Sequence, residues 1–400
     1  MKVCVVGGGP AGMMLGFLLA RSGVEVAVLE KHKDFLRDFR GDTVHPSTIE
    51  LMSELGLLDQ FLAVPFNKVE RVGACIEGED FPIADFTSLP VKCPFIAFMP
   101  QWDFLNFLGA HAKKFPQFHL HLQHEVTGLV EENGRVVGVQ AKSPEGPVEF
   151  RADLVVGADG RTSIVRQCAE LEVADIGAPM DVLWMRISRK ESDPAETLGR
   201  IKAGHFMFMI NRNSYWQCAF LIPKGELDYV KSQGLDKYRE SLTVVAPFLS
   251  DRLGEIDDWD KVKLLTVKVD RLKKWHRPGL LCIGDSAHAM SPIGGVGINL
   301  AIQDAVATSN ILTEPLLKGT LGEDDLAKVQ KRRTMPTERT QAFQVFAQKR
   351  IVQRAIGDTT PFDPPFIMRL TQKFPYLRRF PARMIGMGFR PEHIETKAAE

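Results

Sequence analysis

Short apolar runs that stop at a glycine or an acidic residue recur along this chain of 400 residues. Each run has the length and composition of a buried parallel strand: Lys2–Val6, Val24–Leu29, Asp153–Ala158 and Leu280–Ile283. Helical periodicity follows the first run, covers Gln101–Phe115, and resumes at Asn299. Strands that alternate with helices predict an α/β fold with a parallel sheet, and such sheets bind ligands beyond the carboxyl ends of their strands.

A second pattern interrupts the first. Alternating apolar and polar positions with frequent turns predict antiparallel strands over Val182–Arg189, His205–Ile210 and Ser214–Pro223, followed by a helix over Tyr229–Leu249. We therefore expect three units. They are a discontinuous ligand-binding domain (residues 1–65, 100–175 and 275–320), an inserted and mainly antiparallel β-sheet domain (66–99 and 176–274) and a C-terminal helical segment (321–400).

The first turn carries a dinucleotide-binding fingerprint. Gly7, Gly9 and Gly12 satisfy GxGxxG between a strand and a helix, with Pro10 and Ala11 inside the turn, and the next strand ends at Glu30-Lys31. Such glycines admit a pyrophosphate to the helix N-terminus, and the acid accepts hydrogen bonds from a ribose. With its full strand–turn–helix–strand context, this motif predicts a bound dinucleotide.

Two further strand tips present a carboxylate. The run ending at Ala158 leads into Asp159-Gly160, and the run ending at Ile283 leads into Gly284-Asp285. The second tip continues into a loop with Pro292 and three glycines, and Asn299 is a suitable N-cap for the helix that follows. A carboxylate suits a polyol, and a helix N-terminus suits a negatively charged ring, so this stretch indicates a flavin.

Other candidates are open to an ordinary interpretation. Arg40 suits a diphosphate or a simple surface position about equally, and His45 is more typical of a satisfied loop histidine than of a catalyst. Ser47 and Glu50 have the spacing of a capping box. We interpret the histidines of the stretch 119–124 as an exposed strand face, and expect no metal site.

Composition narrows the class of protein. Fifty basic and fifty acidic residues give zero net charge, which does not favour nucleic acid as a partner. Six scattered cysteines, no signal peptide and no apolar run of membrane-spanning length predict a cytoplasmic protein with reduced thiols. Residues 366–390 contain basic but no acidic side chains. A basic, solvated helix face is the preferred interpretation, with a lid helix, a peripheral membrane contact or a partner contact as alternatives.

Three motifs in this order, GGGPAG with Glu30, GADGRTSIVR and GDSAHAMSPIGGVGINLAIQDA, resemble the class A flavoprotein monooxygenases, the para-hydroxybenzoate hydroxylase-like family. The resemblance covers almost the whole chain. It implies a Rossmann-like FAD-binding fold of the glutathione-reductase type. It also implies an FAD site formed by Gly7, Gly9, Pro10, Ala11, Gly12, Glu30, Lys31, Arg40, Gln101, Val126, Asp159, Asp285, Pro292, Gly295, Val296, Gly297, Ile298 and Asn299.

The resemblance further implies NAD(P)H as a transiently bound co-substrate, O2 as the oxidant, and hydroxylation through a flavin C4a-hydroperoxide. Pro292 and His45 become the catalytic candidates, and Phe206, Phe208, Tyr215 and Gln217 the substrate-binding ones. The hairpin at 206–220 lacks the serine and arginine that hold a benzoate carboxylate in the namesake enzyme, which favours a larger aromatic, quinol or polyketide-like ring. A reductase or dehydrogenase without oxygen insertion, and a binding protein without flavin, remain alternatives.

Overall fold

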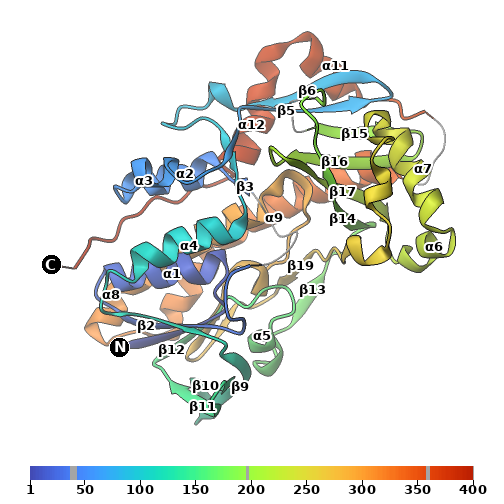
Figure 1. The fold of residues 1–400 in the computed structure, drawn as a ribbon. Helices are drawn as coiled ribbons and strands as arrows, with labels where there is room; N and C mark the ends of the chain where they lie inside the picture. Colours follow the sequence, from blue (N-terminus) through green and yellow to red (C-terminus); the bar gives the residue numbers. More distant parts are fainter. Residues whose placement is uncertain (37–42, 195–197, 357–360, 400) are drawn as a thin grey trace.

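The computed structural model describes residues 1–36, 43–194, 198–356 and 361–399. Its central feature is a six-stranded sheet in the order β20-β21-β12-β1-β2-β8, in which every neighbouring pair is parallel except β20 with β21 (Figure 1). The strands are β1 (Lys2–Val6), β2 (Glu25–Glu30), β8 (Phe118–Leu122), β12 (Leu154–Gly157), β20 (His276–Arg277) and β21 (Leu280–Cys282). The predicted α/β class with a parallel sheet is confirmed.

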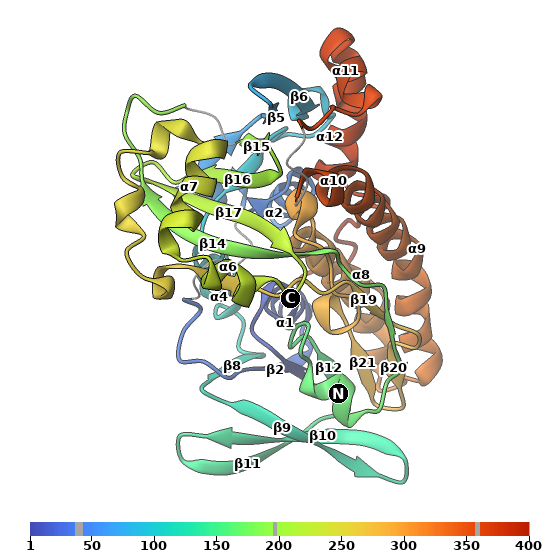
Figure 2. The ribbon, with the colours of Figure 1, turned by 90° about the vertical axis from the view of Figure 1, so that its right-hand side faces the viewer.

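Helices cover one face of this sheet, and a small meander lies on the other side (Figures 1 and 2). The helices are α1 (Pro10–Arg21), α4 (Gln101–Ala112) and α8 (Gly297–Lys318). The meander is β9 (Glu125–Glu132), β10 (Arg135–Ser143) and β11 (Gly146–Arg151). Its hairpin turns at Asn133-Gly134, where both residues have positive φ (49° and 75°), the backbone conformation for which Asn-Gly is favoured in tight hairpins. Val136, Val139 and Ala141 join the core beneath the sheet.

The second unit is a seven-stranded sheet in the order β18-β14-β17-β16-β15-β5-β6, in which only β15 and β5 pair in parallel. Its strands are β5 (Arg71–Ile76), β6 (Glu79–Asp85), β14 (Met180–Ser188), β15 (Leu198–Lys202), β16 (His205–Asn211), β17 (Tyr215–Pro223) and β18 (Lys263–Leu265). Two smaller sheets join β3 (Thr43–Val44), β7 (Ile96–Phe98) and β4 (Asn67–Val69), and β13 (Val173–Asp175) with β19 (Asp270–Leu272). The mainly antiparallel sheet agrees with the alternation in the sequence.

Three helix predictions need correction. The expected helix over 229–249 is two helices, α6 (Leu227–Ser232) and α7 (Leu235–Val245), because Gly234 between them adopts φ 87°. The expected capping box does not form: α2 (Pro46–Glu54) begins with Pro46 after His45, since proline is preorganised for the first helical position. Asn299 is not an N-cap, because α8 begins two residues earlier at Gly297.

The C-terminal part lies along both sheet units. It contains α9 (Glu323–Ala347), a π-turn (Gln348–Val352), α10 (Gln353–Ala355), α11 (Phe366–Lys373), the short turn η8 (Pro375–Arg378) and α12 (Arg379–Gly386). Short helices α3 (Leu58–Leu62) and α5 (Ile164–Cys168) complete the fold. The last residues extend back to α1, where the Ala399 amide donates to the Arg21 carbonyl at 2.8 Å (Figure 1). No helix in the described ranges is both long and apolar enough to cross a bilayer.

Candidate cofactor site

Three strand ends meet at one edge of the parallel sheet, as the sequence predicted. A Cβ added to Gly7, after β1, would lie 2.4 Å from the carbonyl oxygen of Ala158, after β12. The Ser286 hydroxyl, after β21, donates to the carbonyl of Gly157 at 2.6 Å. The turn after β1 thus touches the tip of β12, which is tied to the tip of β21. They form one continuous edge of the kind where α/β sheets hold ligands.

The glycine turn is shaped by close packing at two positions and by open space at a third. Gly7 has φ 107°, and a Cβ on Gly12 would lie 1.9 Å from the Gly7 carbonyl oxygen, so both positions require glycine. Gly9 precedes α1, and nothing in the described residues lies within 4 Å of its added Cβ. The cradle in front of the α1 N-terminus therefore has the open space and the helix polarity that a pyrophosphate requires.

Glu30 ends β2 beside this turn. Its carboxylate accepts the backbone N–H of Gly8 at 3.0 Å and that of His32 at 3.1 Å. These bonds fix the carboxylate at the strand end, where a ribose of a dinucleotide would lie. Lys31 is exposed next to it, and Pro10 and Ala11 form the first turn of α1.

Two aspartates stand at the other strand tips, with different partners. Asp159 holds the start of α5, accepting from the Ser163 hydroxyl at 2.6 Å and the Val165 amide at 3.2 Å. Burial raises the pKa of this carboxyl, although those hydrogen bonds oppose the rise. Asp285 is partly exposed and accepts from Arg161 Nη2 at 3.1 Å. Arg161 Nη1 is buried and has no hydrogen-bond partner in the part of the chain that the structure describes, an unfilled donor beside the predicted polyol site.

The loop from Pro292 to Gly297 approaches the β3 segment closely. Gly294 and Gly295 adopt φ 78° and 63°, and the Thr43 hydroxyl donates to the Gly295 carbonyl at 3.0 Å. Asn299 lies in the first turn of α8, where its Oδ1 accepts from the hydroxyls of Ser47 and Thr48 at 2.7 and 2.8 Å. Asn299 therefore ties the helix to α2 instead of capping it. The backbone of residues 295–298 lies at the N-terminus of this 22-residue helix, which is the positive end of its dipole.

His45 is completely buried and both ring nitrogens face protein groups. Nδ1 lies 2.7 Å from the Ile385 carbonyl of α12, and Nε2 lies 3.3 Å from the Thr43 hydroxyl. Burial lowers the pKa of His45 to about 4, against the smaller opposing effect of its hydrogen bonds to backbone carbonyls. A neutral ring that bridges the glycine loop and the C-terminal helices is suited to positioning the loop.

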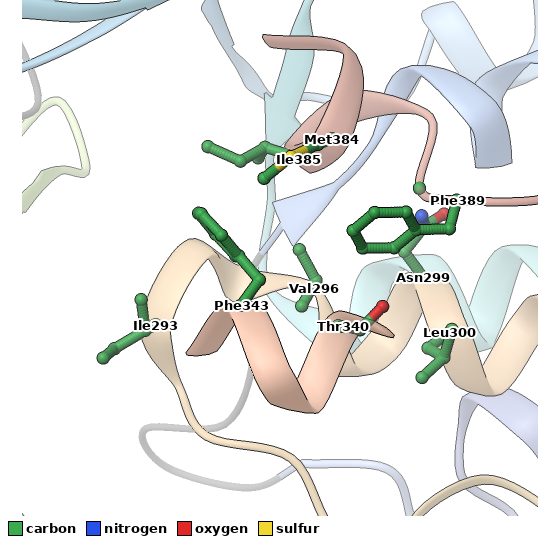
Figure 3. Close-up of a pocket in the computed structure, with 10 residues that line it drawn as sticks. Ile293, Val296, Asn299, Leu300, Thr340, Phe343, Met384, Ile385 and Phe389 are labelled. Atoms are coloured by element: carbon green, nitrogen blue, oxygen red, sulfur yellow. The ribbon is translucent and has the colours of Figure 1, made fainter. Parts of the chain in front are cut away.

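A narrow crevice lies between the glycine loop, the start of α8, α9, and the end of α12 with the residues that follow it (Figure 3). It contains about 390 Å³ of empty space, counting its open mouth. In Figure 3 the Phe389 ring lies beside Asn299, and Phe343 points toward Ile385. The lining is mainly apolar: Ile293, Val296, Asn299, Leu300, Thr340, Phe343, Met384, Ile385, Gly388 and Phe389.

The predicted substrate residues lie on the face of the seven-stranded sheet that meets the glycine loop. Phe206 and Phe208 pack in a cluster that includes Ile293 of that loop, whereas Met207 and Met209 point to the opposite side, against α7. Tyr215 is half-buried under the Arg186 guanidinium, whose carbon lies 3.9 Å from the ring centroid. The Gln217 side chain on the same face is buried and accepts from Arg212 Nε at 3.1 Å.

The remaining predicted contacts are more peripheral. Gln101 is the first residue of α4 and is partly exposed, and Val126 is buried in β9. Arg40 lies outside the described residues. Arg212, in the turn between β16 and β17, is buried beside Gln217.

Sequence reasoning missed a buried ionic cluster behind the site. Asp304 of α8 is fully buried and accepts from the Gly284 amide at 3.0 Å, His288 Nε2 at 2.5 Å and Arg333 Nε at 2.8 Å. Arg333 Nη1 in turn donates to Glu392 of the C-terminal tail at 3.0 Å. Burial alone would raise the pKa of Asp304, but His288 and Arg333 outweigh it and hold that pKa below its ordinary value. An aspartate on the apolar face of a predicted helix was the signal available in the sequence.

Known proteins are similar to this chain in sequence and in fold. The family described as "FAD binding domain" matches residues 1–343. The 6-methylpretetramide 4-monooxygenase of Streptomyces rimosus is 34% identical over 361 residues, which are 87% of this chain and 83% of that protein. This relative is named as a monooxygenase, which agrees with the enzyme class that the motifs predicted.

Solved structures show the same architecture at lower identity. The anhydrotetracycline hydroxylase of Streptomyces rimosus has a TM-score of 0.77 at 23% identity, covering 98% of this chain and 77% of its own. The p-nitrophenol 4-monooxygenase of Pseudomonas putida DLL-E4 has a TM-score of 0.75 at 19% identity, covering 96% and 95%. At these identities the likeness establishes the fold, and the family match with the 34% identical relative establishes the kinship. The chain belongs to the FAD-binding domain family and is an FAD-dependent class A flavoprotein monooxygenase.

Proposed function

We propose that this enzyme uses NAD(P)H and O2 to hydroxylate a fused aromatic, quinol or polyketide-like small molecule. The observation that carries the proposal is the placement of Phe206 and Phe208 in a cluster with Ile293, because it brings an apolar sheet face against the predicted flavin loop. The relative at 34% identity is named for a pretetramide, and a hydroxylase of similar fold for anhydrotetracycline. Both names indicate a ring system larger than a single benzoate.

Bound FAD, once reduced, would supply the activation of O2 and the transfer of one oxygen atom, the other leaving as water. The chain's own residues would hold and orient this cofactor. The Gly7–Gly12 turn would receive the pyrophosphate, Glu30 the ribose, and Asp285 with Arg161 the ribityl chain. The N-terminus of α8 would favour negative charge on the ring. The predicted backbone contact from Pro292 lies at the start of the glycine loop. His45 would support the other end of that loop through Thr43, whose hydroxyl donates to the Gly295 carbonyl.

The substrate surface selects by shape and by exclusion of water. Phe206 and Phe208 offer apolar ring contacts, and Gln217 with Arg212 adds a polar edge on the same face. An apolar, dry enclosure protects a reactive oxygenated cofactor from water, which is why the protein's task here is placement more than proton transfer.

We further infer that the parallel sheet with its meander is a glutathione-reductase-type unit formed by residues 1–65, 100–175 and 275–320. The sheet containing β14 to β17, with residues 66–99, is the substrate unit. All six cysteines are free thiols, which favours a reducing compartment, and we place the enzyme in the cytoplasm.

The decisive experiment follows oxygen. Purified FAD-loaded enzyme is given NADH or NADPH under 18O2 with a panel of phenols, quinols and fused polyketide-like rings, and products are analysed by mass spectrometry. One 18O atom in the product, with substrate-stimulated NAD(P)H oxidation, is expected. A reduced or desaturated product without label would instead support the reductase alternative, and no reaction with any fused ring would contradict the substrate class.

A further inference from the structure

Exposed aromatic and basic side chains cover the outer side of α11, η8 and α12. We call this surface the aromatic–basic face. It contains Phe366, Ile367, Arg369, Lys373, Phe374, Tyr376, Arg379, Phe380 and Arg383. Phe366, Tyr376 and Phe380 are 74%, 62% and 55% exposed. Figures 1 and 2 show α11 at one extremity of the molecule, with α12 between it and the rest of the fold. Both helices lie against β6, the edge strand of the seven-stranded sheet.

The inner sides of these helices already pack against the rest of the protein. Met368 of α11 packs with Phe81 of β6, and Ala382 of α12 packs with Ala84 and Phe86. The aromatic rings on the outer side are therefore not needed for the core. Exposed apolar residues scattered singly are ordinary, but five large ones within fifteen residues of chain form a patch of the kind that marks a docking surface.

The charged side chains of α11, η8 and α12 themselves are all basic. Between Phe366 and Arg390 the chain contains no acidic residue. The Arg379 guanidinium carbon lies 5.1 Å from the Phe380 ring centroid, and Lys373 Nζ lies 5.8 Å from that of Phe374. Acidic groups do border this surface. Asp363 pairs with Arg369 at 2.5 Å, Glu79 accepts from Gln372 at 2.8 Å, and exposed Asp80 lies beside Glu79 in β6.

This combination identifies the chemistry of the partner. A second copy of the same face would bring cations against cations, which opposes symmetric pairing. An anionic lipid surface complements it, because aromatic rings favour the headgroup depth while Lys and Arg bind the negative headgroups. We propose that the aromatic–basic face docks the enzyme reversibly on anionic membranes, as a peripheral contact.

The test uses the FAD-loaded, full-length enzyme and vesicle co-sedimentation. Vesicles of phosphatidylcholine mixed with phosphatidylglycerol are compared with vesicles of phosphatidylcholine alone. We expect roughly tenfold or greater preference for the anionic vesicles. Because exposed charges are screened, the binding weakens as salt is raised.

Two variants separate the contributions of rings and charges. F366S/Y376S/F380S removes three of the four aromatic rings, and R379E/R383E reverses two charges; each should weaken binding by about tenfold or more. Matched controls are Y229S, at an exposed position of α6, and K142E, at an exposed position of β10, and both should bind as the unaltered enzyme does. FAD absorbance and thermal unfolding confirm that each variant is folded.

Either of two results would overturn the proposal. One is equal binding to neutral and anionic vesicles, or none to either. The other is a concentration-dependent dimer, seen by light scattering, that the same substitutions convert to monomer while vesicle binding is unchanged, which would assign the face to contact between copies.

Discussion

At the scale of single residues, two glycines of one motif are required for different reasons. Gly12 is glycine because a Cβ would overlap the Gly7 carbonyl at 1.9 Å, a constraint internal to the protein. Gly9 has open space around it and an ordinary backbone conformation (φ −76°, ψ −175°). The protein itself therefore does not require glycine at position 9, and a ligand remains the physical reason for it.

The substitution Gly9→Ala should accordingly leave the apoprotein's unfolding free energy unchanged and weaken the binding of FAD. The added methyl would enter the pyrophosphate space at a cost of about 1–3 kcal/mol, a rise in Kd of roughly ten- to a hundredfold. Titrating apoprotein with FAD by fluorescence measures this. Gly254→Ala, also unobstructed but in the second unit, is the matched control. Unchanged FAD affinity in Gly9→Ala would contradict the assigned cradle.

His45 predicts a pH dependence of stability. Its pKa falls from 6.5 to about 4 in the folded state because the ring is buried, so the unfolded chain binds more protons between these values. Stability is therefore complete above about pH 6.5 and declines as pH falls toward 4. The total loss is on the order of 3 kcal/mol.

Chemical denaturation at several pH values between 4 and 8 measures this decline. His45→Gln keeps a donor for the Ile385 carbonyl but has no titrating ring, so it should flatten the decline in stability. His119→Gln, at the exposed position of β8, should keep the original slope. Equal slopes in the enzyme and His45→Gln would show that another group controls the acid response.

At the scale of elements, α8, α9 and the C-terminal tail are joined by buried charges. Asp304 holds the Gly284 amide next to Asp285, Arg333 bridges Asp304 to Glu392, and Arg332 binds Glu392 through both carboxylate oxygens. Glu392 of the tail thus gives the buried Arg333 guanidinium a second carboxylate partner besides Asp304. A segment remote in sequence from the flavin motif supports the turn that presents Asp285.

Replacing Glu392 with glutamine should destabilise the protein strongly. Arg333 remains fully buried while one of its counterions is lost, and breaking a buried pair costs about 3–5 kcal/mol. The melting temperature should fall and the FAD dissociation constant should rise, because the turn at Gly284 is held through the same chain of contacts. Glu395→Gln, on the exposed part of the tail, is the control. A melting temperature within error of the unaltered enzyme would refute the coupling.

At the scale of the whole molecule, two sheets divide the work. The parallel sheet brings its strand tips to one edge, and the seven-stranded sheet places an apolar face against the loop that continues from that edge. Neighbouring residues of β16 serve opposite sides: Phe208 faces the glycine loop side, and Met207 the α7 side. The alternation of a strand therefore separates the proposed substrate contacts from the unit's own core.

This separation predicts contrasting variants. Phe208→Ala should raise KM by about tenfold through lost apolar contact and increase NAD(P)H oxidation that yields no product, with FAD affinity unchanged. Met207→Ala should lower the free energy of unfolding by about 2–5 kcal/mol because it leaves a cavity in a fully buried position. Steady-state kinetics with product analysis, and denaturation of the same samples, distinguish the two. Similar effects of both substitutions on KM would contradict the assignment of faces.

The amino-acid sequence by itself determined the local features. Apolar runs, the glycine turn and Asn133-Gly134 depend on neighbours along the chain, so strands, cofactor motif and hairpin were predictable. The contact that Asn299 makes, by contrast, depends on Ser47 and Thr48, about 250 residues away. The sequence pattern named Asn299 as important but assigned it the wrong contact.

Only the tertiary structure decided which groups lie together across long separations. It places Arg161 on Asp285, Arg333 between Asp304 and Glu392, and His45 under Ile385. Periodicity records whether a position is buried, but it carries no information about which distant partner fills the space beside it. The parallel sheet and its glycine turn could therefore be derived from order along the chain, whereas the ionic support of the site follows from packing in three dimensions.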